Sequence, residues 1–68
     1  MAGPVRQETI PNGSASARLA QLGAELLEQK ADKQLYFLRP YGLYALVRQQ
    51  GNGATWIGYF QDRSSCGC

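Results

Sequence analysis

The chain has 68 residues, a formal net charge of +2 and 44% hydrophobic residues. This length allows one domain at most, and the hydrophobic content is typical of a globular chain rather than a disordered one. A folded chain this short buries only about 60% of the surface that its unfolded form exposes, so it is marginally stable without reinforcement. The basic excess is well short of the charge clustering that marks most nucleic-acid-binding domains.

No apolar run approaches the roughly 18 residues of a membrane span. The segment Met1–Arg6 has no apolar core of a secretory signal, so we expect a cytoplasmic protein without a membrane partner. The cysteines, Cys66 and Cys68, are too close in sequence for a stabilising disulfide. They can supply half of a zinc site or form a redox pair. We favour an inert tail, with no metal and no cofactor.

The first predicted element is an amphipathic helix. Residues 1–13 are rich in Gly, Pro and polar groups, which predicts a flexible N-terminal arm. Ser14 and Ser16 are plausible N-caps, and strong helix formers run from Ala17 to Ala31. The apolar side chains at helical spacing are Ala15, Leu19, Leu22 and Leu26. The helix should end near residues 31–33.

Three strands are predicted after the helix. Residues 34–39, 43–49 and 54–60 are rich in aromatic and bulky side chains. Pro40 and Gly42 suit a β-turn, and Asn52-Gly53 is the preferred type I′ hairpin turn. The expected fold is therefore α+β, with one N-terminal helix packed on a three-stranded antiparallel β-meander. It forms a single domain over residues 14–61, followed by a flexible Cys-containing tail at 62–68.

Both faces of this meander are apolar, and one helix covers only one face. If the turn quartets are Arg39–Gly42 and Gly51–Ala54, alternation sorts the side chains between the faces. An exposed apolar face with Tyr and Arg is typical of an interaction site. The predicted interface residues are Phe37, Tyr44, Leu46, Arg48, Ile57 and Tyr59. Alternatively, the N-terminal arm covers this face, or a turn that differs by one residue swaps the faces within a strand.

Catalysis is not expected. The chain contains no histidine, so the usual general base at neutral pH is absent. Gly51-Asn52-Gly53 lacks the strand–loop–helix context and the lysine of a phosphate-binding loop. We therefore expect a non-enzymatic protein with no small-molecule substrate.

Nucleic-acid binding is the alternative. All seven aromatic residues lie between Tyr36 and Phe60, and aromatic side chains on a sheet can stack bases while arginine contacts phosphate or guanine. Residues 41–60 resemble the three-stranded DNA-reading sheet of ethylene-response-factor and integrase arm-binding domains, in the segments Leu43–Arg48 and Trp56–Phe60. The resemblance implies contacts by Arg39, Arg48 and Trp56. The chain departs from that pattern because its predicted helix precedes the sheet and the sheet carries few bases.

Together these observations favour a small protein-interaction module of adaptor or inhibitor type, of the kind found in mobile elements. It is expected to self-associate through one sheet face as a homodimer, the commonest closed assembly. The alternative is a nucleic-acid-binding domain that uses a basic, aromatic sheet.

Overall fold

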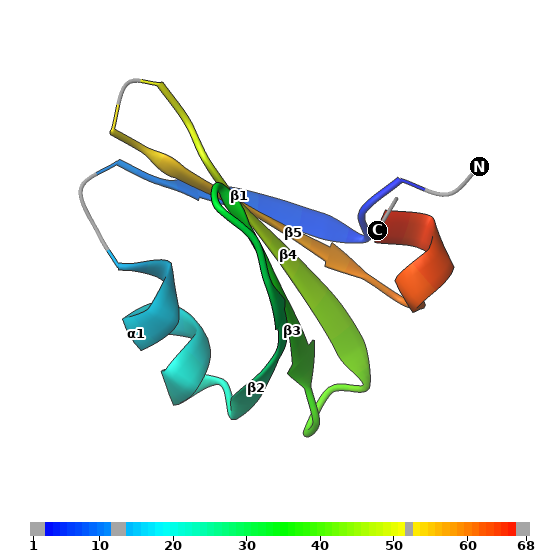
Figure 1. The fold of residues 1–68 in the computed structure, drawn as a ribbon. Coiled ribbons are helices and arrows are strands. Elements are labelled where there is room, and N and C mark those ends of the chain that lie inside the picture. Colours follow the sequence, from blue (N-terminus) through cyan, green and yellow to red (C-terminus); the bar gives the residue numbers. More distant parts are fainter. Residues whose placement is uncertain (1–2, 12–13, 52, 67–68) are drawn as a thin grey trace.

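The computed structural model describes residues 3–11, 14–51 and 53–66. The fold is α+β, as expected, but its antiparallel sheet has five strands, in the order β1-β5-β4-β3-β2, instead of three. The helix is not the first element, because a strand precedes it. The elements are β1 (Arg6–Ile10), α1 (Ala15–Gln21), β2 (Ala24–Gln29), β3 (Lys33–Leu38), β4 (Leu43–Gln49), β5 (Thr55–Phe60) and the 3-10 helix η1 (Arg63–Cys66). Figure 1 shows α1 in the hollow of a bent sheet, with η1 on the other side.

Strand β1 lies where the sequence predicted a flexible arm. Residues 6–10 pair antiparallel with β5, and Val5 N donates to the carbonyl oxygen of Tyr59 at 2.7 Å. Four of the five strand residues are polar, which hides the strand from a hydrophobicity pattern. Backbone hydrogen bonds to β5 hold this segment in the sheet. Such bonds cannot be predicted from the pattern of side chains.

Helix α1 ends ten residues earlier than predicted. Ser14 is the N-cap, and its hydroxyl accepts from Ala17 N, as the sequence indicated. At the other end, Gly23 has a φ of +77° and its N–H donates to the carbonyl oxygen of Ala20. A left-handed glycine just past the last helical turn is a common stop signal. Gly23 is therefore a terminator and not a glycine inside a longer helix.

Strand β2 consists of residues with high helix propensity that are paired as a strand. Ala24 stands opposite Leu38, and Leu26 stands opposite Tyr36. A bulge between Leu26 and Glu28 interrupts the register. Propensity differences of a few tenths of a kcal/mol per residue are small compared with tertiary pairing, which here decides the outcome. The predicted helical stripe therefore breaks at Leu26.

The two hairpins test the predicted registers. The β3–β4 register is confirmed, with Leu38 opposite Leu43 and a left-handed Gly42 (φ +67°) in the turn. The β4–β5 register is one residue away from the prediction, because Arg48 pairs with Trp56 and not with Ile57. Gly53 N donates to the carbonyl oxygen of Gln50, and Gln50 N to that of Ala54, so Gln50 stands opposite Ala54, while Asn52 of the predicted turn lies outside the described residues. An odd loop length swaps the two faces of β5 relative to β4.

Two apolar clusters form, one on each side of the sheet. The larger cluster joins α1 to the sheet through the fully buried Leu19. Its buried members are Ala15, Leu19, Tyr36, Leu38, Ala45, Val47, Ile57 and Tyr59. We call the side of the sheet away from α1 the second face. On it, Leu35, Leu46 and Phe60 are buried, with Tyr44 and Trp56 packed against them. Contacts of η1 with β4 and β5 extend this cover beyond the end of the sheet.

Gly58 gives the ring of Trp56 its place on the second face. A Cβ atom at residue 58 would lie 2.8 Å from Cζ2 of that ring and closer still to Cη2. The indole therefore occupies the space above the glycine, next to Leu46 of the neighbouring strand. The indole Nε1 donates to Oε1 of Gln7 at 3.0 Å, which fixes the ring from the β1 side.

Replacement of Gly58 by alanine should force the Trp56 ring off the sheet. We expect Gly58→Ala to lower the free energy of unfolding by about 1–3 kcal/mol, the usual cost of overpacking. Gly51→Ala is the matched control, because nothing lies within 4 Å of a Cβ at residue 51. Urea unfolding followed by tryptophan fluorescence measures both. Equal stability of the two variants would contradict the placement of the ring.

Candidate functional site

The predicted interface residues do not share one face. Phe37, Tyr44, Leu46 and Arg48 lie on the second face, as expected, whereas Ile57 and Tyr59 lie on the helix side. The one-residue difference in the β4–β5 loop causes this split. On the second face, β5 places Trp56, Gly58 and Phe60 where Ile57 and Tyr59 were expected.

The second face is also less open than the sequence predicted. On this face Leu35, Leu46 and Phe60 have exposed fractions of only 2%, 2% and 5%, so these three side chains are already buried within one chain. Phe37 and Tyr44 are half-buried and their rings pack with centroids 5.0 Å apart. The expectation of an uncovered apolar face is therefore wrong, because the indole of Trp56 and η1 cover much of it.

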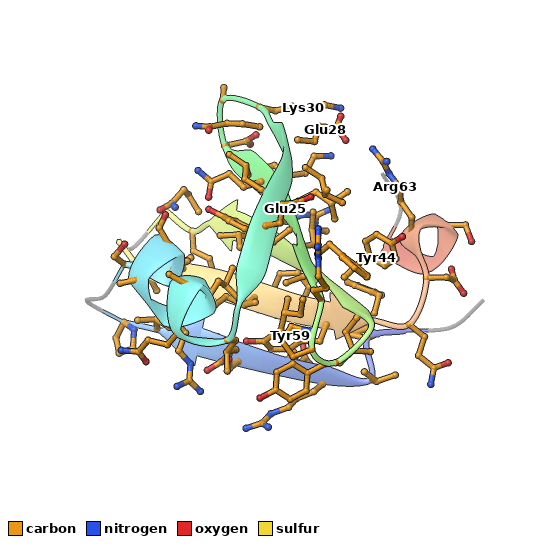
Figure 2. All side chains as sticks on the ribbon, turned by 90° about the horizontal axis from the view of Figure 1, so that it is seen from below. Glu25, Glu28, Lys30, Tyr44, Tyr59 and Arg63 are labelled. Atoms are coloured by element: carbon orange, nitrogen blue, oxygen red, sulfur yellow. The ribbon has the colours of Figure 1, made fainter. Side chains whose placement is uncertain are left out.

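Ion pairs border the second face on the side of β2. Arg63 of η1 donates to Oε2 of Glu28 at 3.1 Å, and Lys30 lies 3.6 Å from Oε1 of the same carboxylate. Figure 2 shows Glu28 between these two cations, with Tyr44 below Arg63. Each pair is solvent-exposed and contributes about 0–1 kcal/mol. Their effect is to neutralise the acidic groups at this border.

A row of basic and aromatic side chains crosses the second face from β3 to β5, beginning at Lys33, which lines a small hollow together with Glu28 and Lys30. Arg48 stands directly opposite Trp56 on one side and Lys33 on the other. Like charges in opposed positions are destabilising, and neither base forms an ion pair with any residue that the structure describes. Asp32 and Gln49 line the shallow hollow beside them. We call Lys33, Arg48 and Trp56 the basic row.

The sequence-predicted nucleic-acid contacts are only partly brought together. Arg48 and Trp56 are cross-strand neighbours, but Arg39 lies at the β3–β4 turn and donates to Oε1 of Glu25 at 3.1 Å. Lys33 was not among the predicted contacts. The sequence could have identified it, because extending the predicted β3–β4 register by one residue pair beyond Gln34 places Lys33 opposite Arg48.

Strand β2 forms an open edge of the sheet that sequence reasoning missed. It pairs with β3 on one side and with no other described strand. Leu26 is 47% exposed and Leu27 is 39% exposed, two adjacent leucines at the bulge. The predicted helix hid this edge, because it assigned Leu26 to a buried stripe. Edge strands with exposed apolar side chains are sites for pairing with another chain.

On the helix side, Tyr59 and Glu8 form a hydrogen-bonded pair between β5 and β1. The Tyr59 hydroxyl donates to Oε2 of Glu8, while Arg18 of α1 lies 3.4 Å from Oε1. Burial, and then the hydrogen bond and the negative charge of Glu8, raise the pKa of Tyr59 to about 12. Arg18 and Arg6 oppose this shift in part. The phenol is therefore a neutral hydrogen-bond donor at physiological pH.

Other chemistry has limited support in the described part of the chain. Residues 3–11, 14–51 and 53–66 contain no cluster of three or more His, Cys, Asp or Glu that can hold a metal ion. Within the same residues, no helix has the length and apolar character needed to cross a membrane. Cys66 ends η1, and Cys68 lies outside the described residues. The role of the two cysteines stays a prediction.

Comparisons with protein-family models, with curated proteins and with solved structures found no match for this chain.

The pH dependence of stability tests the Tyr59–Glu8 pair. Because the pKa of Tyr59 is raised from 10.0 to about 12, the folded chain binds more protons than the unfolded chain between these values. The stabilisation is present below pH 10.0 and is lost as the pH rises through about 12. Urea unfolding of wild type and Tyr59→Phe should show a stability difference that shrinks across this window.

A tyrosinate absorbance titration gives an independent reading of the same pair. One tyrosine of the folded chain should ionise near pH 12 in wild type, and this step should disappear in Tyr59→Phe. A stability difference that stays constant up to pH 12, or an unchanged titration curve in the variant, would contradict the pair.

Proposed function

We propose that the chain is a small non-enzymatic protein-interaction module that binds an extended segment of a partner protein along the open edge of β2. The observation that carries the proposal is the exposure of Leu26 and Leu27, adjacent on an edge strand whose outer backbone groups pair with no described strand. Addition of a strand to an open edge is a common mode of peptide recognition, in which backbone hydrogen bonds supply affinity and side-chain contacts supply specificity.

The charges along β2 favour an apolar partner segment. Glu25 and Glu28 flank the two leucines, and each already pairs with a cation of its own chain. The bulge between Leu26 and Glu28 limits how far continuous backbone pairing can extend. A short segment with apolar side chains opposite the leucines therefore fits this edge better than a long or strongly charged strand.

Self-association, which the sequence favoured, meets one obstacle at this edge. An antiparallel two-fold pairing centred between Leu26 and Leu27 would place Glu25 of one copy opposite Glu28 of the other. Directly opposed like charges destabilise a strand pair. This register therefore disfavours a homodimer, and a homodimer in another register is an outcome that the experiment must distinguish.

The double variant Leu26→Lys, Leu27→Lys tests the edge. Peptides selected from a random library for binding to the wild-type chain should bind the variant about tenfold more weakly or worse, a loss of about 1.4 kcal/mol. Val5→Lys is the matched control, because Val5 is a 53% exposed apolar residue beside β1, at the opposite edge.

Light scattering on the same proteins separates the partners. A wild-type dimer that becomes monomeric in the double variant identifies the edge as a self-pairing site, whereas a wild-type monomer that binds selected peptides supports a different partner. Peptide binding that survives in the double variant but is lost in the Val5→Lys control would contradict the proposal.

The basic row supports a second candidate, the binding of single-stranded nucleic acid. The half-buried Trp56 ring lies over Gly58 on the sheet, a geometry suited to stacking one base. Arg48 and Lys33 stand beside it without an ion pair to any described carboxylate, so both are free to contact phosphate. The small net charge of +2 places this candidate second.

Salt dependence tests the basic row. Binding of a single-stranded oligonucleotide should weaken as salt rises, because condensed counterions are released. Arg48→Gln should reduce the slope of log affinity against log salt by about 0.7, the value for one phosphate contact on a single strand. Arg6→Gln, a charge-matched change on the opposite face, should leave the slope unchanged. Equal slopes in all three proteins, or no binding at low salt, would exclude this function.

A further inference from the structure

A half-open pocket of about 130 Å³ lies on the helix side of the sheet, between β1, α1 and the β3–β4 turn. Its apolar lining, which we call its floor, consists of Leu22, Leu38 and Leu43; Leu38 belongs to the larger core cluster and the other two pack against it. A dry cavity of about 150 Å³ lined by apolar side chains holds one benzene molecule. The pocket therefore has room for a compact apolar body of about one ring.

The rim of the pocket carries an excess of positive charge. Arg6 of β1 and Arg18 of α1 line it together with one carboxylate, that of Glu8. Both oxygens of Glu8 are engaged, since Oε2 accepts from the Tyr59 hydroxyl and Oε1 lies 3.4 Å from Arg18. Arg6 pairs with no carboxylate of the residues that the structure describes. One guanidinium at the mouth is therefore uncompensated.

The remaining rim groups also suit an anion with an aromatic or aliphatic body. Tyr41, in the β3–β4 turn, is 59% exposed and lines the pocket from the side opposite β1. Its ring can cover the apolar body of a bound molecule, while Arg6 reaches the charged end. Figure 2 shows Tyr59 at the border with β1, next to the strand that carries Arg6 and Glu8.

We propose that this pocket binds a small monocarboxylate with a compact apolar body, such as a benzoate-like acid. The carboxylate contacts Arg6, with Arg18 adding long-range attraction while it holds Glu8. The apolar body lies on the three leucines. Guanidinium–carboxylate hydrogen bonds are among the stronger polar contacts in proteins, and their directionality favours a planar anion over a spherical one. The site shares no residue with the β2 edge or the basic row.

A titration with three small probes tests the site. Benzoate carries the proposed charge and body, benzylamine keeps the ring and reverses the charge, and acetate keeps the charge and lacks the ring. Amide shifts in an NMR titration should show saturable benzoate binding at β1, α1 and the β3–β4 turn. Benzylamine and acetate should each bind about tenfold more weakly or worse, because each loses one of the two contacts.

Two arginine variants complete the test. Arg6→Gln should weaken benzoate binding about tenfold, whereas Arg48→Gln, an exposed arginine on the other face, should not change it. Amide shifts of the free proteins report whether each variant keeps the fold. Benzylamine or acetate binding as tight as that of benzoate, an Arg6→Gln variant that binds like wild type, or the absence of saturable benzoate binding would overturn the proposal.

Discussion

The contact between the Trp56 indole and Gly58 decides which surfaces of this chain stay open. The sheet is apolar on both sides, and α1 has only seven residues, enough to cover one side. On the other side, the largest side chain of β5 lies over a glycine of its own strand and beside Leu46. An apolar face that would otherwise need a partner is thereby buried largely within the chain. Burial of this area offsets part of the entropy cost of ordering a short chain.

With much of both faces covered, three surfaces stay open: one sheet edge, one row across the second face and one pocket on the helix side. The edge of β2 exposes two leucines and unpaired backbone, the basic row exposes two cations and one indole, and the pocket exposes Arg6 above an apolar floor. These surfaces differ in chemistry. An extended apolar peptide, a single-stranded nucleic acid and a small carboxylate are therefore distinguishable ligands, and a variant at one surface leaves the other two intact.

The charged side chains divide into those with an ion-pair partner and those without one. Acidic groups on the second face, Glu25 and Glu28, pair with cations of neighbouring elements, and Glu8 on the helix side pairs with Arg18 and Tyr59. Lys33, Arg48 and Arg6 pair with no carboxylate in the described part of the chain. Cations without an ion pair therefore lie on both sides of the sheet, Arg6 at the pocket and Lys33 and Arg48 in the basic row, where Asp32 lies beside them.

Local signals in the sequence predicted a hairpin over residues 34–49, because Pro40 and Gly42 fix its turn, and they indicated Ser14 as one of two candidate caps. The helix length was wrong because Gly23 is equally compatible with a helix interior and with a helix end, and only the pairing of β2 with β3 distinguishes them. Strand β1 was missed because its polar side chains carry no apolar alternation. The face of β5 depends on whether two or three residues form the loop before it, and the sequence Gly51–Gly53 permits both.

NMR measures the position of the Trp56 ring relative to Gly58 directly. An indole that lies over Gly58 shifts the α-protons of this glycine upfield through its ring current. The account predicts a marked upfield shift of at least one Gly58 α-proton in the wild-type chain, which disappears in Trp56→Leu while the amide pattern of α1 and β3 is retained. A Gly58 α-proton shift that is ordinary for a strand glycine and unchanged by Trp56→Leu would contradict the account.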